Sequence, residues 1–345
     1  MARAPALRSL GRAVVRVACL LLSLSLVGCS GPVRPIPAAA AGIHAGAPEA
    51  VQLWQDASIF RLLDGMIQHA RHRVLVEVYE IGRSDVIQQM SSARDRSIDV
   101  RVITDPTVSA SRASAARLAA LGVAARFYPI DDRAHQIDHV KLLIADGVAA
   151  VGGMNWGTHS DRNHDYVLET HVAGEVARLV QIFEQDWALA GGRPAPLAAE
   201  FAQVGQTAPG EEIRRMLESA LTAARHRALA EIYTLTDPDV LADLAAGRRR
   251  GVDVRVLLDP NQPYNLHAFD VLRAAGVPVR WYPVPVGALL HAKTALCDGE
   301  LVLGSANWTY SGLDVNHELD IETADPRAVR SYSDRFESDW NRSPA

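Results

Sequence analysis

The chain has 345 residues, of which 48% are hydrophobic and 22% charged, a composition typical of a globular protein that can bury a full core. The length predicts about two domains. Its 40 acidic residues outnumber its 35 lysines and arginines, which disfavours broad electrostatic capture of nucleic acid.

The first 28 residues predict a secretory signal peptide, because four arginines and no acids accompany an apolar run too short to span a bilayer. The run ends in Leu26-Val27-Gly28-Cys29, which resembles the lipobox of bacterial lipoproteins and implies that Cys29 is lipidated and anchored in the bacterial cell envelope. An ordinary signal peptide with an incidental cysteine is the alternative. Residues 29–48, rich in Pro, Ala and Gly, predict a flexible tether.

Loss of the signal leaves 31 basic and 40 acidic residues, a net charge of −9. With Cys19 removed and Cys29 lipidated, Cys297 remains alone, so no intrachain disulfide is expected.

Each half of the remaining chain is predicted to open with an amphipathic helix, at Ile59 to Ala70 and at Ile213 to Ala224. Runs rich in β-branched or aromatic residues predict strands in the first half at 74–79, 100–104, 125–128, 140–145, 149–151 and 166–170. A closing helix is expected near 175–189. Several strands are apolar on both faces, which predicts an α/β fold with helices on both faces of each mixed sheet.

The two halves repeat one another at an offset of 152 to 154 residues. Residues 70–79 match 224–233, and Phe183-x-x-Asp186-Trp187 matches Phe336-x-x-Asp339-Trp340. A duplication explains this better than chance similarity between two unrelated α/β domains. It predicts two tandem, pseudo-twofold-related domains at residues 49–190 and 203–345, with a linker at 191–202.

The chain has only two lysines against 33 arginines, and each lysine follows a histidine by two positions. The first pattern is His139-x-Lys141-x4-Asp146 followed by Gly152-Gly153-x-Asn155, and the second is His291-x-Lys293-x4-Asp298 followed by Gly304-Ser305-x-Asn307. Alternate residues of a strand share a face, so each histidine is expected beside its lysine, with the asparagine brought back by the return strand. Asp146 and Asp298 precede a glycine and are interpreted as structural turn residues.

Two such sets suit a phosphodiester. A pseudo-twofold pair of imidazoles supplies an attacking group on one side of a phosphorus atom and a proton donor for the leaving oxygen on the other. The lysines and asparagines would hold the non-bridging oxygens and offset the charge that develops on them.

These residues resemble the paired HxKx4D motifs of the phospholipase D superfamily, from about residue 50 to 342. The resemblance implies that His139 is the nucleophile and forms a phosphohistidine intermediate, and that His291 protonates the leaving alcohol. Water or a second alcohol then completes the transfer, without metal or cofactor. The order of the two histidines follows the family's habit, since the halves are nearly equivalent.

The family also places an acid shortly after an asparagine to hydrogen-bond the catalytic histidine. Asn316-His317-Glu318 fits this pattern, whereas Asn163-His164-Asp165 has a shorter acid with less reach towards His139. A second departure is Gly153, which replaces a serine that Ser305 retains. Gly153, Ser305, Glu77 and Glu231 are candidate substrate-binding residues; the two glutamates either line the cleft or brace a lysine.

Three functions remain open. A phosphodiesterase or phosphatidyl transferase acting on phospholipids is favoured, because a lipid anchor would hold the enzyme at a membrane. An extracytoplasmic nuclease would need a basic groove, to which residues 248–250 contribute three arginines. A non-catalytic phosphoryl-binding protein is the third, and the completeness of both motifs argues against it. Because one chain supplies both motifs, a monomer is expected.

Overall fold

The structure is a computed structural model that describes residues 50–196 and 199–344, all within one compact unit. The predicted signal peptide, Cys29 and the tether of residues 29–48 lie outside the described residues. Within the described ranges, no helix is long and apolar enough to cross a membrane.

The first half folds around a seven-stranded sheet with the order β1-β7-β6-β5-β2-β3-β4. Strands β2, β3 and β4 are parallel, and each of the others runs antiparallel to its neighbours. The strands are β1 (Val51–Gln55), β2 (Arg73–Val78), β3 (Asp99–Thr104), β4 (Ala124–Phe127), β5 (Lys141–Ala145), β6 (Val148–Gly152) and β7 (Tyr166–Thr170).

The second half repeats this arrangement in the order β11-β10-β9-β12-β13-β14-β8. Its parallel strands are β9, β10 and β11, the counterparts of β2, β3 and β4. The strands are β8 (Val204–Thr207), β9 (Arg227–Ile232), β10 (Asp253–Leu258), β11 (Val279–Trp281), β12 (Lys293–Cys297), β13 (Glu300–Gly304) and β14 (Glu318–Thr323).

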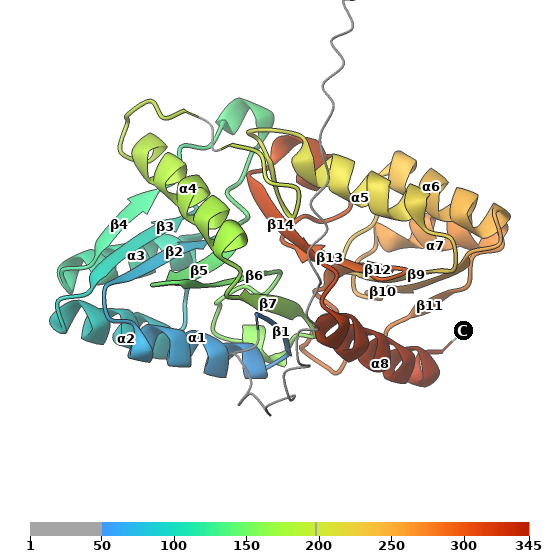
Figure 1. Ribbon diagram of the computed structural model, residues 1–345, viewed down its shortest axis with the longest axis horizontal. Coiled ribbons are helices and arrows are strands. Elements are labelled where there is room, and N and C mark those ends of the chain that lie inside the picture. The colour runs from blue at the N-terminus through green and yellow to red at the C-terminus, as the bar shows by residue number, and fades with distance from the viewer. Residues whose placement is uncertain (1–49, 197–198, 345) are drawn as a thin grey trace, which may run out of the picture. The chain divides into compact units, whose positions relative to one another are not determined.

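Helices cover both faces of each sheet (Figure 1). The outer faces carry α1 (Ser58–His69), α2 (Ser84–Asp95) and α3 (Ser109–Ala120) in the first half, and α5 (Glu212–Ala223), α6 (Pro238–Arg249) and α7 (Asn265–Ala274) in the second. The inner faces carry α4 (Ala173–Leu189) and α8 (Pro326–Arg342). Short helical turns lie at Asp132–Ala134, Ser160–Arg162 and Ser311–Val315.

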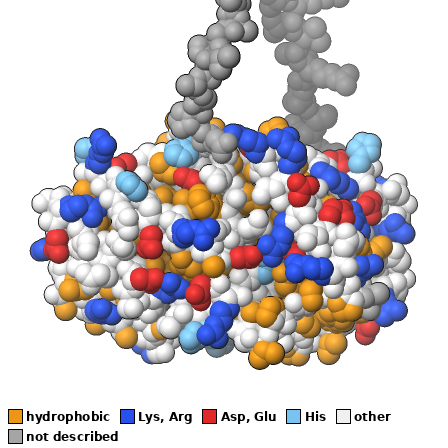
Figure 2. All heavy atoms as spheres, turned by 90° about the horizontal axis from the view of Figure 1, so that it is seen from below, with side chains coloured by type: hydrophobic (Ala, Val, Ile, Leu, Met, Phe, Trp, Pro, Cys, Tyr) orange, Lys and Arg blue, Asp and Glu red, His pale blue; other side chains and the backbone are white. Residues whose placement is uncertain are grey.

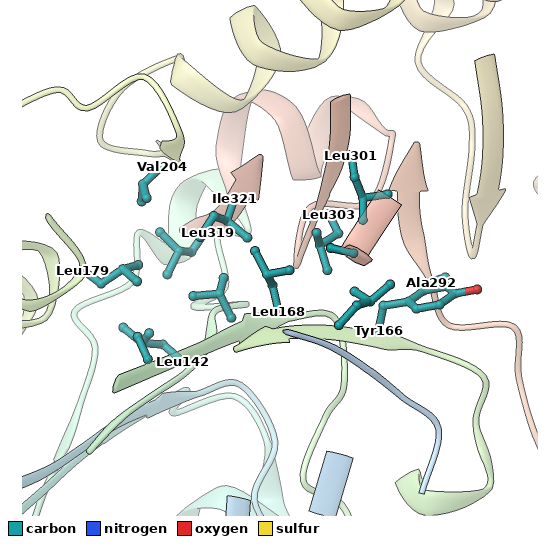
Figure 3. Packing of buried hydrophobic residues seen from close by; sticks show 14 of the residues in the cluster. Leu142, Tyr166, Leu168, Leu179, Val204, Ala292, Leu301, Leu303, Leu319 and Ile321 are labelled. Atoms are coloured by element: carbon teal, nitrogen blue, oxygen red, sulfur yellow. The ribbon is translucent and has the colours of Figure 1, made fainter. Parts of the chain in front are cut away.

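The alternation of apolar side chains explains this layering. In β2, Val74 and Val76 face the outer core with α1 and α2, whereas Leu75 faces the inner core, because successive strand residues point to opposite faces. The inner core is shared by both halves, and Leu168 packs there with Leu303 and Leu319 (Figure 3). The halves are therefore joined by one continuous apolar core.

The tandem α/β prediction is confirmed, and the six strands predicted in the first half each lie within two residues of the observed ends. The prediction that each half opens with a helix is wrong, since the strands β1 and β8 precede α1 and α5 and pair with β7 and β14. Both are short edge strands, and Gly205 weakens the strand pattern of β8.

Candidate active site

In each sheet the motif lies at the start of a central strand, beside the end of the first parallel strand. Lys141 begins β5 and pairs with Val78 at the end of β2, and Lys293 likewise begins β12 and pairs with Ile232 at the end of β9. His139 and His291 stand just before these strands rather than inside them.

The segments that carry the histidines cross over between the halves. The His139 N–H donates to the His317 carbonyl at 2.8 Å, and the His317 N–H donates to the Ile137 carbonyl at 2.9 Å. The second crossing mirrors the first, with the His291 N–H on the His164 carbonyl and the His164 N–H on the Leu289 carbonyl, both at 2.8 Å. Each HxK segment therefore pairs with the Asn-His-acid segment of the other half.

This crossing decides which acid reaches which histidine. Glu318 Oε2 accepts from His139 Nδ1 at 2.8 Å, and Asp165 Oδ2 accepts from His291 Nδ1 at 2.8 Å. The expectation that Asp165 serves His139 is therefore wrong, because the backbone bridges bring it to the histidine of the opposite half. Since each Nδ1 carries its proton towards a carboxylate, Nε2 is the ring nitrogen left for chemistry.

The two departures from the family pattern compensate for one another. A Cβ atom on Gly153 would stand 2.5 Å from Asp165 Oδ1, so the absent side chain leaves the space that this carboxylate fills. In the second half, Ser305 Oγ donates to Glu318 Oε2 at 2.6 Å and accepts from the Leu319 N–H at 2.9 Å. A serine with the longer acid and a glycine with the shorter acid are two solutions to the same packing problem.

Each histidine and its lysine share one tyrosine ring. The His139 ring meets the Tyr79 ring edge-on with centroids 4.9 Å apart, and Lys141 Nζ lies 5.2 Å from the same centroid. Tyr233 takes this place beside His291 at 4.7 Å and Lys293 at 5.1 Å. The sequence analysis assigned these tyrosines no role, although the repeat of a tyrosine after Glu77 and Glu231 marked them.

Both lysines are almost fully buried, and each donates to the carbonyl of its own histidine. Burial lowers the pKa of Lys141 to about 7 and that of Lys293 to about 8. The charge of Lys293 depresses the pKa of Lys141 further, while Glu318 opposes the decrease. A bound phosphate anion would favour the charged ammonium form of both lysines.

The pKa values of the two histidines depend on the charges of both motifs. Burial, followed by the charges of Lys141 and Lys293, lowers the pKa of His139 well below its usual range. Burial and Lys293 lower the pKa of His291 to about 3, and Lys141 adds to the decrease. Each histidine responds to the lysines of both halves, so the two motifs lie close enough to interact electrostatically. Both imidazoles are neutral near pH 7 before substrate binds.

The asparagines of the motifs carry unsatisfied polar atoms. Asn155 Oδ1 and Asn307 Oδ1 are buried and have no hydrogen-bond partner among the described residues. Each asparagine precedes a tryptophan that bridges to the segment just after the site tyrosine, Trp156 to Ile81 and Trp308 to Leu235. A flip of the side-chain amide exchanges its oxygen and nitrogen, so each asparagine can present an N–H donor to a ligand.

Asp146 and Asp298 lie away from this space. Asp146 accepts the backbone N–H groups of residues 71, 72 and 73 at 2.8 to 3.0 Å, and Asp298 accepts those of residues 225, 226 and 227 at 2.9 Å. Both have positive φ angles in the turn that follows β5 or β12. These carboxylates fasten the residues that begin β2 or β9 to the hairpin turn that follows β5 or β12. They contact no other motif residue.

Glu77 and Glu231 do not line the cleft, because neither has any exposed surface. Glu231 accepts from the Tyr166 hydroxyl at 2.6 Å and lies 3.4 Å from His164 Nε2. Glu77 lies 3.5 Å from His317 Nε2. Each glutamate thus faces the central histidine of the other half's Asn-His-acid segment, beneath the site, so the substrate-binding expectation for both is wrong.

The repeated aspartates and aromatic residues complete these two buried groups. Asp186 lies 3.2 Å from His317 Nε2, and Asp339 lies 3.4 Å from His164 Nε2. The His317 ring stacks on Tyr128 at 4.4 Å, and the His164 ring stacks on Tyr282 at 5.1 Å. Identical roles at repeat-related positions indicate that the duplication preserved the docking of the halves.

The donors of these groups are also the described side chains best placed to hold a metal. Glu77, Asp138 and His317 in one group, and His164, Glu231 and Asp339 in the other, bring their donor atoms within 4.8 Å of one another. In the second group, Arg335 donates to Asp339 at 2.7 Å and to Asp56 at 2.8 Å, which balances the carboxylates. In the group of His317, burial opposes but Tyr128, Asp186 and Glu77 raise the pKa of His317 well above its usual range. The protonated imidazolium of His317 therefore balances the carboxylates there.

A cavity of about 770 Å³ opens beside the site. Its first-half wall contains Glu80, which follows Tyr79, and Asn163, which precedes His164 and Asp165. Its second-half wall contains Leu289, two residues before His291, and the Leu289 N–H donates to Asn163 Oδ1 at 3.1 Å. The full lining is Glu80, Gly157, Thr158, His159, Ser160, Asn163, Asn261, Gly287, Ala288 and Leu289.

Comparison with known proteins gives matches in both halves. The family model described as "Cardiolipin synthase, PLD-like domain" matches residues 63–187 and 217–340. Cardiolipin synthase 2 of Bacillus anthracis is 27% identical over 335 residues, covering 84% of this chain and 63% of that protein. Cardiolipin synthase of Geobacillus kaustophilus (strain HTA426) is 29% identical over 297 residues, covering 73% of this chain and 58% of that protein.

Among solved structures, phosphatidylserine synthase of Haemophilus influenzae Rd KW20 superimposes with a TM-score of 0.67 over 85% of this chain and 86% of that chain, at 12% identity. At this identity the likeness concerns the fold. The chain spans roughly three-fifths of the length of the two cardiolipin synthases.

Proposed function

The chain belongs to the phospholipase D superfamily, through the family of cardiolipin synthase, phospholipase D-like domains that matches both of its halves, and from this premise we propose that it cleaves or transfers phospholipid phosphodiesters through a phosphohistidine intermediate. The observation that carries the proposal is the reciprocal pairing of His139 with Glu318 and of His291 with Asp165, each at 2.8 Å. Two oriented imidazoles that share two lysines suit displacement at one phosphorus atom.

In the first step, His139 Nε2 attacks phosphorus, a P–N bond forms, and the P–O bond to the leaving alcohol breaks. Glu318 holds the Nδ1–H of His139 and stabilises the positive charge on the ring. His291 donates its Nε2 proton to the leaving oxygen, with Asp165 on its Nδ1. Substrate binding must therefore raise the pKa of His291 from about 3, and an adjacent phosphodiester anion acts in that direction.

In the second step, the neutral His291 removes a proton from water or from an alcohol, and the resulting oxygen nucleophile displaces His139 from phosphorus. Lys141 and Lys293 balance the charge on the non-bridging oxygens in both steps. Asn155 and Asn307, whose side-chain oxygens are buried without partners in the described part of the chain, would donate their amide N–H groups to the non-bridging oxygens after a flip of the amide. The side chains of one chain supply every role, which supports a monomeric enzyme.

A phospholipid is the proposed substrate class. The relatives that support it are named cardiolipin synthases. The face of the molecule in Figure 2 intersperses arginines with acids and apolar side chains, which suits a nucleic-acid backbone poorly. Lipidation of Cys29 would hold the enzyme at the surface where this substrate resides.

The experiment begins with the soluble diester bis(p-nitrophenyl) phosphate in the presence of EDTA, comparing the native chain with His139→Ala. Turnover by the native chain and none by the variant is expected; equal turnover by both would remove His139 from the mechanism. Vesicles of phosphatidylglycerol, vesicles of phosphatidylcholine and single-stranded DNA then compete as substrates. Preferential cleavage of the DNA would replace the phospholipid proposal with a nuclease.

The anchoring proposal has a separate test. Expression in a bacterial host with a labelled fatty acid should label the native chain and leave Cys29→Ala unlabelled. A native chain that acquires no label would indicate an ordinary signal peptide.

A further inference from the structure

Large apolar side chains are exposed at two loops that border the cavity. Tyr264 is 68% exposed and Leu266 61% exposed at the start of α7, and Val286 is fully exposed in the loop between β11 and β12. Such side chains lose favourable free energy when they remain in water. We call these three residues the apolar rim.

Two residues of the apolar rim are linked to the candidate active site through Asn265 and Tyr233. Asn265, between Tyr264 and Leu266, donates to the Tyr233 carbonyl at 2.8 Å and accepts from the Leu235 N–H at 2.9 Å. The Tyr233 ring in turn packs on His291. Gly287, next to Val286, lines the cavity together with Asn261. The loops that form the second-half wall of the cavity therefore carry the apolar rim.

The first half provides an internal comparison for the start of α7. Ser111 corresponds to Asn265, because its hydroxyl donates to the Tyr79 carbonyl at 2.8 Å and accepts from the Ile81 N–H at 3.2 Å. The neighbours of Ser111 are Ala110 and Arg112, in the places of Tyr264 and Leu266.

The loop in the place of Val286 carries the exposed residues Asp131, Asp132 and Arg133. The fold thus tolerates small or charged residues at all three positions, and the packing of the domain does not require apolar ones.

The two walls of the cavity also differ in polarity, with the more polar wall in the first half. The first-half wall offers polar groups from Glu80, His159, Ser160 and Asn163. The exposed Arg162 lies beside the second-half loop, with its guanidinium 3.8 Å from the position of a Cβ atom on Gly287. A tyrosine, aliphatic side chains and an arginine on the loops that border one cavity match the chemistry of an anionic lipid interface.

We propose that the apolar rim inserts into the acyl-chain region of an anionic phospholipid surface, so that the lipid enters with its headgroup along the polar first-half wall and its acyl chains over the second half. This inference rests on the proposed phospholipid function. It assigns different tasks to two halves whose catalytic groups are nearly equivalent.

The test compares the native chain with the triple variant Tyr264→Ala, Leu266→Arg, Val286→Asp, which gives the second half the residue types of the first. On phosphatidylglycerol vesicles, kcat/KM is expected to fall at least roughly tenfold, because membrane binding scales with the apolar area inserted. On soluble bis(p-nitrophenyl) phosphate, kcat/KM should equal that of the native chain, which also reports correct folding. Equal activity of the two proteins on vesicles would overturn the proposal.

A second measurement locates the surface directly. An environment-sensitive fluorophore on Val286→Cys should shift to the blue on addition of phosphatidylglycerol vesicles, whereas the same label on Ala134→Cys in the matching first-half loop should not. A label at residue 286 that stays in water would also overturn the proposal. Loss of the proposed function is recognised separately, because the native chain would then turn over no phospholipid vesicles, whether or not it turns over the soluble diester.

Discussion

Asp165 and His291 belong to opposite halves of the chain, yet Asp165 Oδ2 accepts a hydrogen bond from His291 Nδ1 at 2.8 Å. Glu318 and His139 form the reciprocal pair. Neither half can orient its own histidine, so a competent site exists only when the halves are docked. The shared inner core and the buried groups around His164 and His317 thereby support the geometry of the candidate site as well as stability.

Gly153→Ser is expected to lower kcat about tenfold or more, because correct placement of an acid–base group is worth factors of this size. The new side chain would stand within 2.5 Å of Asp165 Oδ1. Asp165 cannot move aside freely, since it also accepts the Tyr166 N–H at 2.8 Å. Steady-state kinetics on bis(p-nitrophenyl) phosphate measure the loss.

The double variant Gly153→Ser, Asp165→Glu is the matched control, because it copies the Ser305–Glu318 arrangement of the second half. It should recover most of the lost kcat. If the double variant is as slow as the single one, the two departures do not compensate for one another as the geometry indicates.

The assignment of nucleophile and acid predicts different failures for the two histidines. His291→Ala should release one equivalent of p-nitrophenol from bis(p-nitrophenyl) phosphate and then stall, because this leaving group needs little protonation but the second step needs a base. His139→Ala should give no burst. Stopped-flow absorbance measures the burst of p-nitrophenol, and intact-protein mass spectrometry detects the trapped adduct. A burst from His139→Ala alone would reverse the assignment.

The sequence was sufficient to predict the duplication and the α/β class, and it marked the two histidines, lysines and asparagines that the structure brings together as repeated motifs. Strand alternation and the fixed spacing between His139 and Asn155 are local, and local patterns survive in a single sequence. The structural character of Asp146 also followed from a local signal, the glycine after it. Because the repeat presents each motif twice, the spacing in one half could be checked against the other.

The crossing between the halves could not be predicted in this way. Which carboxylate reaches which histidine depends on backbone bridges between residues more than 120 positions apart. The burial of Glu77 and Glu231 escaped prediction for the same reason, since their partners, His317 and His164, come from the opposite half. A pseudo-twofold sequence is equally compatible with pairing within halves and between them.

Asp146→Ala is expected to lower the free energy of unfolding by ~1–2 kcal/mol, as for the loss of a helix cap, because three backbone N–H groups lose their acceptor. The kcat of the folded variant should stay near that of the native chain. Urea denaturation and kinetics measure both quantities, and Asp298→Ala should behave alike. A large fall in kcat with unchanged stability would make the motif aspartate catalytic after all.

The same carboxylate contributes to acid sensitivity. Against the opposing effect of burial, the backbone hydrogen bonds lower the pKa of Asp146. Its stabilising contribution is therefore fully present above the unfolded value of about 3.9 and is lost as the pH falls through the lower folded value. Below that range the unfolding free energies of the native chain and Asp146→Ala should converge.

The pH dependence of kcat/KM is expected to be a narrow bell with both limbs near neutrality. Burial raises the pKa of Glu318 to about 7, so acidification protonates the acceptor of His139. Burial lowers the pKa of Lys141 to about 7 and of Lys293 to about 8, so alkalinity removes the ammonium charges. Because kcat/KM reports the free enzyme, the alkaline limb should move upward in kcat, where bound phosphate retains the lysine protons. An alkaline limb near the ordinary lysine value of about 10.4 would contradict this account.

Lys141→Arg is expected to lose most activity although the positive charge is kept. Lys141 is 3% exposed, and its ammonium fits between the His139 carbonyl and the Tyr79 ring. A guanidinium is larger, planar and directional, so it must displace one of these neighbours and move the charge away from the phosphate oxygens. Arg112 is exposed, so the substitution Arg112→Lys is a control for exchanging these two residue types and should leave turnover unchanged. Full activity of Lys141→Arg on bis(p-nitrophenyl) phosphate would show that charge alone suffices, and the restriction of lysine to these two positions would then have another cause.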